Sequence, residues 1–343
     1  MSTTVRRADA TPDAKRPPMP APGPHHGAGQ TLFARALVIN GDSEPGSTLV
    51  RQLTARGTVV VGAATPAGAS HEDGDVAHLE HLVRLPDADS PEYIPALART
   101  LERFNIDLLI PAGGPELPAI AIAKNLLEAT GAAVLVPGIA PLSLTDDRLA
   151  GLAHLRSRGV PVPDFTTPSS AGDIDTALEV LGGAFLARPR RSLSSRAHSM
   201  IVTRPTDFGD HVFDDRWVLS AVQPGVQFAV ALHRPPSGRE RREVIVQREG
   251  IRLPLEHGAQ FMTTTDPEPL AAHAMPEVER TALATIRAIG LTGAATVSVR
   301  VSPEGEPMVI NVEPRLAPTV ARAPRVLEAA LGSLHEQKLA RRR

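Results

Sequence analysis

The chain has 343 residues, a length typical of two or three domains, and 42% of its residues are hydrophobic, which excludes wholesale disorder. Its 38 acidic and 36 basic residues give a net charge of -2, so charge offers no reason to expect a nucleic-acid partner. No apolar run approaches the roughly 20 residues that cross a bilayer, and the lack of cysteine excludes disulfides and thiolate metal sites. These features predict a cytoplasmic protein with no membrane partner.

The first 33 residues differ in composition from the rest of the chain. They contain six prolines, most of them in the stretch RPPMPAPGPHHG, and show no hydrophobic period. Such a segment buries too little apolar surface to offset the entropy of ordering. We therefore expect a disordered tail over residues 1–33.

Strands and helices alternate after the tail, as in parallel β-α-β winding. Short apolar runs predict strands at 36–41, 58–64, 107–113 and 132–138. Segments with a 3.6-residue period, two of them closed by Gly57 and Gly131, predict helices at 47–57, 92–106 and 116–131. Residues 34–143 are thus expected to form a Rossmann-like domain.

The pattern changes to α+β over residues 144–330. A helix is expected from Thr145 or Asp146 to Gly159, and another over 276–293. Strands are expected at 182–191, over 217–233 as two strands about Pro224-Gly225, and at 242–253. Residues 295–315 predict a hairpin, and the remaining residues, 331–343, are expected to form a basic C-terminal tail.

Two segments contain residues that could bind a nucleotide or a metal ion. ING-DSEPG at 39–46 resembles a nucleotide-binding turn, but the chain has neither G-x-G-x-x-G nor a Walker GK[ST], so we favour the interpretation of an ordinary β-α turn. On the second strand of the hairpin, Asn311 and Glu313 are two residues apart and so share one face, with Arg315 beside them. A carboxylate, an amide and an arginine suit a Mg²⁺ that bridges phosphate oxygens, although a plain polar strand face is the alternative.

At this point the sequence resembles the ATP-grasp superfamily. The segment VINVEPRLAPTVARA resembles its signature strand in the form found in the carbamoyl-phosphate synthetase large subunit. IDLLIPAGGPEL, TDDRLAGLAHLRSRGVPVPDF, FLARPRRSLSSR, AVQPGVQFAVAL and IRAIGLTGAATVSVRVSPEG resemble further family segments in the correct order. The resemblance covers roughly residues 34–330. It implies a Rossmann-like pre-ATP-grasp domain (34–143) followed by a two-subdomain ATP-grasp domain (144–330).

The resemblance also assigns roles to single residues. Arg148 and Arg188 stand at the two basic positions that hold nucleotide phosphates, where carbamoyl-phosphate synthetases also carry arginine. Arg315 would hold phosphate as well, and Asn311, Glu313 and Ser298 would bind Mg²⁺. Ser194, Ser195 and Arg196 lie in the phosphate loop, which has no glycine here. The hinge acid that commonly binds ribose maps near Ala221, and Ser298 replaces an acid or glutamine.

The implied activity is ATP-dependent ligation of a small-molecule carboxylate to an amine or a related nucleophile, through an acyl phosphate. ATP and Mg²⁺ are the expected cofactors, and a homodimer is left open. Because Ala221, Ser298 and the glycine-free loop depart from the family, two alternatives stay open. One is a catalytically impaired homologue that binds nucleotide or a protein partner, and the other is an unrelated α/β binding protein.

Overall fold

The computed structural model describes residues 31–66, 77–193, 199–236, 241–251, 261–263, 276–316 and 323–341. The described residues from Thr31 onward belong to one compact unit. Of the tail predicted over 1–33, residues 1–30 lie outside the described ranges. Phe33 is not part of a tail, because its ring is buried in the core, edge-on to His335.

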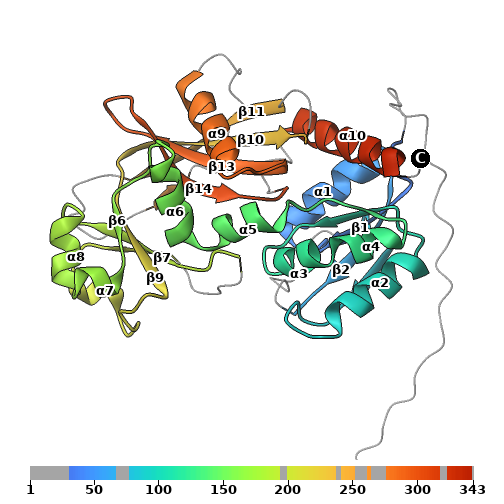
Figure 1. Ribbon diagram of the computed structural model, residues 1–343, viewed down its shortest axis with the longest axis horizontal. Helices are drawn as coiled ribbons and strands as arrows, with labels where there is room; N and C mark the ends of the chain where they lie inside the picture. The colour runs from blue at the N-terminus through green and yellow to red at the C-terminus, as the bar shows by residue number, and fades with distance from the viewer. Residues whose placement is uncertain are drawn as a thin grey trace, which may run out of the picture. The chain divides into compact units, whose positions relative to one another are not determined.

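A five-stranded parallel sheet organises the first domain (Figure 1). Its strands run in the order β3-β2-β1-β4-β5, and alternate residues of β1 are buried on opposite faces, as both faces of a parallel sheet usually are. The strands are β1 (Arg35–Ile39), β2 (Val59–Ala64), β3 (His81–Arg84), β4 (Leu108–Pro111) and β5 (Ala133–Val134). The helices are α1 (Glu44–Ala55), α2 (Tyr93–Arg103), α3 (Leu117–Ile122) and α4 (Lys124–Ala129).

Two of the predicted helices are each divided in the structure. The helix expected over 116–131 is interrupted at Ala123, whose ψ of 7° separates α3 from α4. The helix expected to begin at Thr145 or Asp146 is divided at Asp147 into α5 (Ile139–Asp146) and α6 (Arg148–Ser157). Asp147 is extended at φ -84° and ψ 98°, and its carboxylate caps α6 by accepting from the Ala150 amide at 3.2 Å.

A four-stranded antiparallel sheet with its own core follows in the chain. Its order is β6-β9-β7-β8, and Phe185, Phe208 and Trp217 pack in its core. The elements are β6 (Phe165–Thr166), α7 (Pro168–Ala171), α8 (Ile174–Val180), β7 (Phe185–Pro189), β8 (Met200–Val202), the 3₁₀ helix η1 (Pro205–Phe208) and β9 (Trp217–Ala221).

The third sheet carries the predicted hairpin. It is antiparallel in the order β12-β11-β10-β13-β14, and the strands are β10 (Gly225–Arg234), β11 (Arg241–Ile251), β12 (Phe261–Thr263), β13 (Gly293–Val301) and β14 (Pro307–Glu313). Helix α9 (Pro276–Ala288) packs on β13 and β14 through Val278, Ala282 and Ile286. The prediction of a hairpin over 295–315 is confirmed, and so is the pair of strands about Pro224-Gly225.

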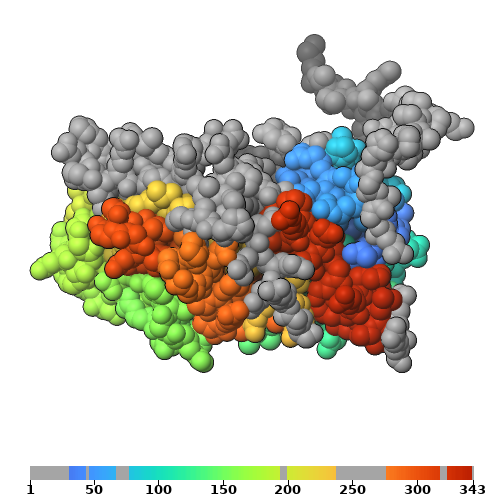
Figure 2. All heavy atoms as spheres, turned by 90° about the horizontal axis from the view of Figure 1, so that it is seen from above, coloured from blue at the N-terminus to red at the C-terminus, as the bar shows by residue number. Residues whose placement is uncertain are grey.

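Helix α10 (Pro324–Arg341) occupies most of the segment expected to be a basic tail. Leu331 and Leu334 are buried in a cluster that contains residues of β1 and α1, and the Lys338 ammonium donates to the Asp107 carbonyl at 2.9 Å. Figure 2 shows α10 in red beside the blue N-terminal elements. The sequence pattern does not reveal this packing, because α10 also contacts β10 and β13 and its apolar residues therefore do not form one narrow stripe. Among the described residues, no helix is long and apolar enough to span a membrane.

Candidate active site

A pocket of about 310 Å³ is lined by residues of the second and third sheets. Its lining comes from β7, from the end of β9, the start of β10 and the segment between them, from β13 and β14, and from the first residue of α6, together with Pro163 and Ser199. The lining residues are Arg148, Pro163, Leu186, Arg188, Ser199, Ser220, Ala221, Val222, Gln223, Gln227, Ser298, Arg300, Ile310, Asn311 and Glu313. Five of the predicted site residues therefore meet in one cavity: Arg148, Arg188, Ser298, Asn311 and Glu313.

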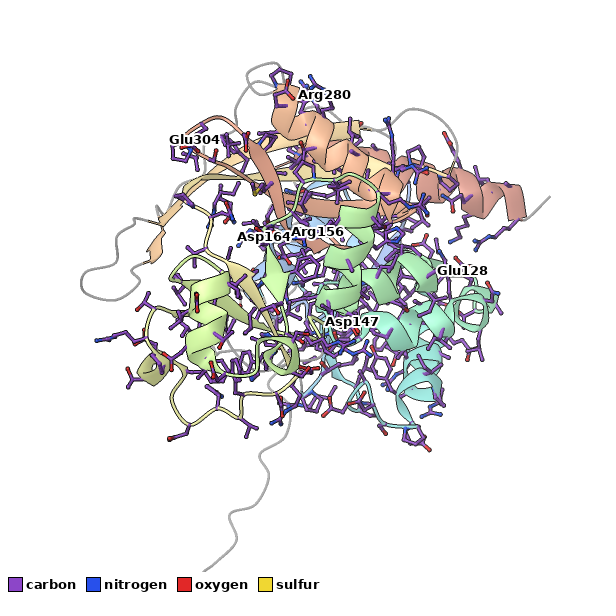
Figure 3. All side chains as sticks on the ribbon, turned by 60° about the vertical axis from the view of Figure 1, so that its left-hand side comes forward. Glu128, Asp147, Arg156, Asp164, Arg280 and Glu304 are labelled. Carbon is purple, nitrogen blue, oxygen red and sulfur yellow. The ribbon has the colours of Figure 1, made fainter. Side chains whose placement is uncertain are left out.

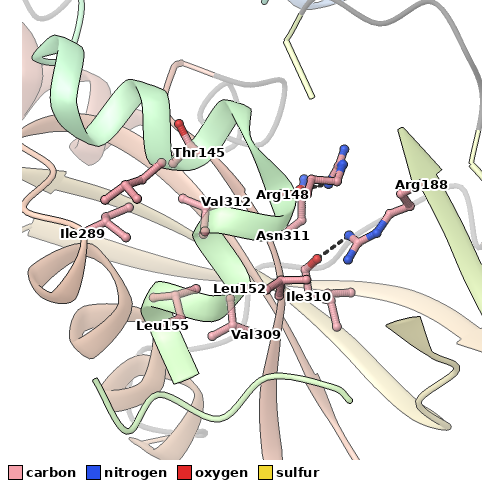
Figure 4. A pocket seen from close by; sticks show the side chains of 12 residues that line it. Thr145, Arg148, Leu152, Leu155, Arg188, Ile289, Val309, Ile310, Asn311 and Val312 are labelled. Atoms are coloured by element: carbon pink, nitrogen blue, oxygen red, sulfur yellow. Dashed lines mark hydrogen bonds between the residues drawn. The ribbon is translucent and has the colours of Figure 1, made fainter. Parts of the chain in front are cut away.

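Arg148 reaches this pocket because it begins α6 directly after the extended Asp147. Its Nε donates to the Pro189 carbonyl at 2.9 Å, and its Nη1 donates to Asn311 Oδ1 at 3.1 Å (Figure 4). Burial lowers the pKa of Arg148, while Glu313 and Asp146 act in the opposite direction by favouring the charged form. The arginine thus bridges the second sheet and the predicted metal-binding strand.

Two neighbouring aspartates bind the other arginines of this region. Asp147 accepts from Arg190 Nε at 3.0 Å, and Asp146 accepts from Arg191 Nη1 at 3.1 Å. Asp147 lies at the start of α6 in Figure 3. Arg190 and Arg191 are therefore paired with carboxylates, and neither of them lines the first pocket.

Arg188 is a buried cation on β7, with 7% of its surface exposed. Its Nη1 donates to the Ile310 carbonyl at 2.5 Å (Figure 4). That carbonyl is available because β14 has an extra residue there: Ser298 pairs with Asn311 but Val299 pairs with Val309, so Ile310 forms a β-bulge. Burial, with Arg148 and then Arg300 nearby, lowers the pKa of Arg188 to about 9.

A second pocket, of about 520 Å³, adjoins the first and extends to the parallel sheet's domain. Arg148, Asn311 and Glu313 line both pockets, and the second also contains Asp87, Asp89 and Arg315 among its lining residues. Arg315 Nη1 donates to the Ala112 carbonyl at 2.5 Å, and its Nη2 lies 3.6 Å from Glu313 Oε2. Arg315 therefore fixes the end of β14 against β4 and places a cation in the second pocket.

The remaining predicted residues have different outcomes. Ser194, Ser195 and Arg196 lie outside the described residues. Ala221 lines the first pocket, as the hinge assignment requires, and polar residues of the same lining include Ser220, Gln223, Gln227 and Arg300. The sequence reasoning missed Arg300, although the two-residue period of β13 puts it on the same strand face as Ser298.

The donor set fits one Mg²⁺ rather than a metal cage built by the protein alone. Glu313 supplies a carboxylate, and Asn311 Oδ1 keeps a second lone pair beyond the one that accepts from Arg148. No cluster of three or more His, Asp or Glu side chains that could hold a metal occurs in the described part of the chain. Mg²⁺ is commonly held in this way, by one or two carboxylates plus substrate phosphates.

Comparison with solved structures identifies the architecture. An L-amino acid ligase from Bacillus licheniformis superposes with a TM-score of 0.62 at 16% identity, covering 87% of this chain and 74% of that one. A D-alanine--D-alanine ligase from Bacillus anthracis gives 0.56 at 16% identity, covering 90% and 99%. The chain has the ATP-grasp ligase fold.

Two further comparisons agree with the ATP-grasp architecture. The ADP complex of N5-carboxyaminoimidazole synthetase from Staphylococcus aureus gives a TM-score of 0.58 at 15% identity, covering 82% of this chain and 70% of that one. In sequence, a putative D-alanine--D-lactate ligase from Streptomyces coelicolor is 24% identical over 281 residues, which are 77% of this chain and 78% of the relative. No protein-family model matches the chain.

Proposed function

We propose that the protein is an ATP-dependent ligase that activates a small carboxylic acid and joins it to an amine or a related nucleophile. The observation that carries this proposal is the junction of two pockets at Asn311 and Glu313. One pocket offers arginines that suit phosphates, and the other offers Arg315 with Asp87 and Asp89. A phosphoryl donor and an acceptor bound in them would meet at the junction.

In the proposed reaction a carboxylate oxygen forms a bond to the γ-phosphorus of ATP while the bond to the β-phosphate oxygen breaks, releasing ADP. The nucleophile then bonds to the carbonyl carbon of the acyl phosphate, and phosphate and a proton leave. Arg148 and Arg188 would bind and orient the phosphates, acting chiefly through charge and position. Mg²⁺, when bound at Glu313 and Asn311, would supply further charge neutralisation at the phosphates.

The second pocket suggests the kind of substrate. The family resemblance assigns Arg315 to phosphate, but its place in the second pocket suits a substrate carboxylate instead, and Asp87 and Asp89 can bind an ammonium group. The sequence relative and two of the solved structures are named as ligases of amino acids or of D-lactate, which supports this chemistry. A closer kinship to carbamoyl-phosphate synthetase, a homodimer and a cytoplasmic location remain predictions from the sequence.

The test is phosphate release from Mg-ATP with a panel of amino acids and small carboxylic acids. We expect release that depends on one acid, and Arg315→Gln should raise the KM for that acid while leaving ATP binding in place. Arg280→Gln on the exposed side of α9 is the matched control (Figure 3). Turnover that Arg315→Gln leaves unchanged would contradict the role given to this residue.

A second candidate function has its own observation. Among its described lining residues the first pocket has one carboxylate, Glu313, and it carries Ala221 and Ser298 at positions where the family commonly has polar or acidic ligands. A homologue that binds nucleotide without turning it over would fit this lining. A clear thermal shift with Mg-ATP, with no phosphate release across the panel, would favour this candidate over the ligase.

A further inference from the structure

A buried carboxylate lies at the edge of the parallel sheet where its strands end. Glu116 comes shortly after β4 and has 0% of its surface exposed. Asn40 comes directly after β1, and Thr65 directly after β2. In the strand order β3-β2-β1-β4-β5 the chain leaves β1 for β2 on one side and later reaches β4 on the other. Open α/β sheets commonly bind ligands at the edge of the sheet beside such a reversal.

Hydrogen bonds join these three side chains. Thr65 Oγ1 donates to Glu116 Oε1 at 2.6 Å, and Asn40 Nδ2 donates to the same oxygen at 2.9 Å. Asn40 Oδ1 in turn accepts from the Thr65 amide at 3.3 Å. Asn40 has φ 56°, in the left-handed region that asparagine adopts more readily than most residues. One buried carboxylate oxygen therefore ties the ends of β1 and β2 to the segment that follows β4.

The turn between β4 and this carboxylate, residues 112–115, packs directly against the network. A Cβ added at Gly113 would overlap with Glu116 Oε2 and with Asn40 Nδ2, so only a hydrogen atom fits there. The Gly114 carbonyl accepts from the Leu117 amide at 3.1 Å, which closes the turn. The position of the turn is therefore set by the hydrogen-bonded network behind it.

The same turn forms part of the second pocket. Gly114 and Pro115 line that pocket, together with Leu193. A Cβ added at Gly114 would lie 3.1 Å from the Leu193 carbonyl oxygen, so the two segments are in close contact. The Ala112 carbonyl accepts from Arg315 Nη1 at 2.5 Å. A shift of the turn would therefore move one wall of the pocket and the acceptor that holds Arg315.

We propose that Glu116 is a positioning residue for the acid that binds in the second pocket. Its carboxylate fixes the 112–115 turn, the turn fixes Arg315 through the Ala112 carbonyl, and Arg315 binds the substrate carboxylate. Glu116 is not among the described lining residues of either pocket, so it acts through these neighbours. The inference rests on the proposed function, because it assumes that an acid occupies the second pocket. Misplacement of a substrate-positioning group by about 1 Å can cost about a hundredfold in rate.

The test is phosphate release from Mg-ATP by the full chain, with the concentrations of D-alanine, L-alanine and D-lactate varied in turn. Glu116→Ala removes the oxygen that accepts both hydrogen bonds, and we expect the KM for the acid that is used to rise by about tenfold. The Kd of ATP, which binds in the first pocket, should stay within about twofold of the wild-type value.

A conservative variant separates the hydrogen bonds from the rest of the side chain. Glu116→Gln keeps an accepting oxygen at Oε1. Because Glu116 Oε2 has no hydrogen-bond partner among the described residues, the amide that replaces it loses no bond. The KM for the acid should therefore stay within about threefold of the wild-type value. A tenfold rise in Glu116→Gln, equal to that in Glu116→Ala, would contradict the role given to the accepted hydrogen bonds.

A double substitution shows whether Glu116 acts through Arg315. Arg315→Gln alone should raise the KM for the acid. Adding Glu116→Ala should raise it further by no more than about twofold, because residues that act along one route do not have additive effects. Increases in KM that multiply in the double variant would overturn the proposed route.

The contact can also be tested from the side of the turn, which matters if Glu116→Ala does not fold. Gly113→Ala should raise the KM for the acid, because its Cβ displaces the turn from the network. Gly332→Ala on α10, with no atom within 4 Å of the added Cβ, should leave the KM unchanged.

The outcomes separate this inference from the proposed function. A KM for the acid that neither Glu116→Ala nor Gly113→Ala changes would overturn the inference and leave the proposed function standing. An equal loss of acid and ATP binding would also overturn it, because a general loss of structure would then explain the effect. No phosphate release by the wild-type chain with any acid of the panel would overturn the proposed function, and this inference with it.

Discussion

The charge of Arg188 should lower the stability of the ligand-free protein and strengthen ATP binding. We expect Arg188→Met, which keeps a long side chain and removes the charge, to raise the stability of the ligand-free protein and to weaken ATP binding. The reason is that this guanidinium is buried on β7, and its charged neighbours named above are other arginines. A bound anion would offset the free-energy cost of burying this charge.

The size of the effect follows from the pKa of Arg188. The pKa falls by about 3.5 to about 9, and at 1.36 kcal/mol for each pKa unit this corresponds to a cost of about 5 kcal/mol for holding the charge in the folded state. The substitution also removes the hydrogen bond to the Ile310 carbonyl, which offsets about 2 kcal/mol of the gain. A net stabilisation of about 3 kcal/mol remains.

The assay is thermal and urea denaturation of both proteins without nucleotide, with ATP titration alongside. A gain of about 3 kcal/mol should raise the melting temperature of a compact unit of this size by roughly 4–5 °C. The pH dependence of stability follows from the same pKa. Above about pH 9 the unfolded state binds more protons than the folded state, so the free energy of unfolding of the wild type should increase with pH relative to that of Arg188→Met. A lower melting temperature together with unchanged ATP affinity would refute the reasoning.

Three further predictions concern other parts of the chain. Burial lowers the pKa of His233 to about 4, so as the pH falls the unfolded state takes up a proton before the folded state does. The free energy of unfolding should therefore decrease by up to about 3 kcal/mol between pH 6.5 and pH 4. Denaturation of His233→Gln should not show this decrease. Gly225 has φ 124°, and a Cβ there would lie 1.9 Å from the Val301 carbonyl oxygen. Gly225→Ala should therefore lower the free energy of unfolding by roughly 2–4 kcal/mol. Gly182→Ala, at φ 83° with no atom near the added Cβ, should lower it by only about 1 kcal/mol. Deleting residues 1–30 should leave the melting temperature nearly unchanged, and a loss of several degrees would show that this segment contributes to the folded state.

Much of the site could be predicted from the sequence because its signals are local. The alternation along β14 was enough to place Asn311 and Glu313 on one face, and both line the two pockets. The Pro-Glu-Gly turn was enough to predict the hairpin. The order of the family-like segments was enough to bring Arg148 and Arg188 to the same cavity.

The features that the sequence could not supply depend on contacts between distant segments. The bulge at Ile310 appears only in the pairing of β13 with β14, and the orientation of Arg300 depends on the register of β13 against β10. The ion pairs of Asp146 and Asp147 join residues more than forty positions apart. The burial of Leu334 in α10 requires a surface that residues from the start of the chain provide.

The most direct test of the central claim is a parallel titration of the wild-type chain with Mg-ATP and with NAD, repeated on Arg148→Met and Arg280→Met. The account predicts one ATP site per chain, no comparable NAD binding, loss of ATP affinity by about tenfold or more in Arg148→Met, and no change in Arg280→Met. Tight NAD binding with no ATP binding, or ATP affinity that survives Arg148→Met unchanged, would contradict it.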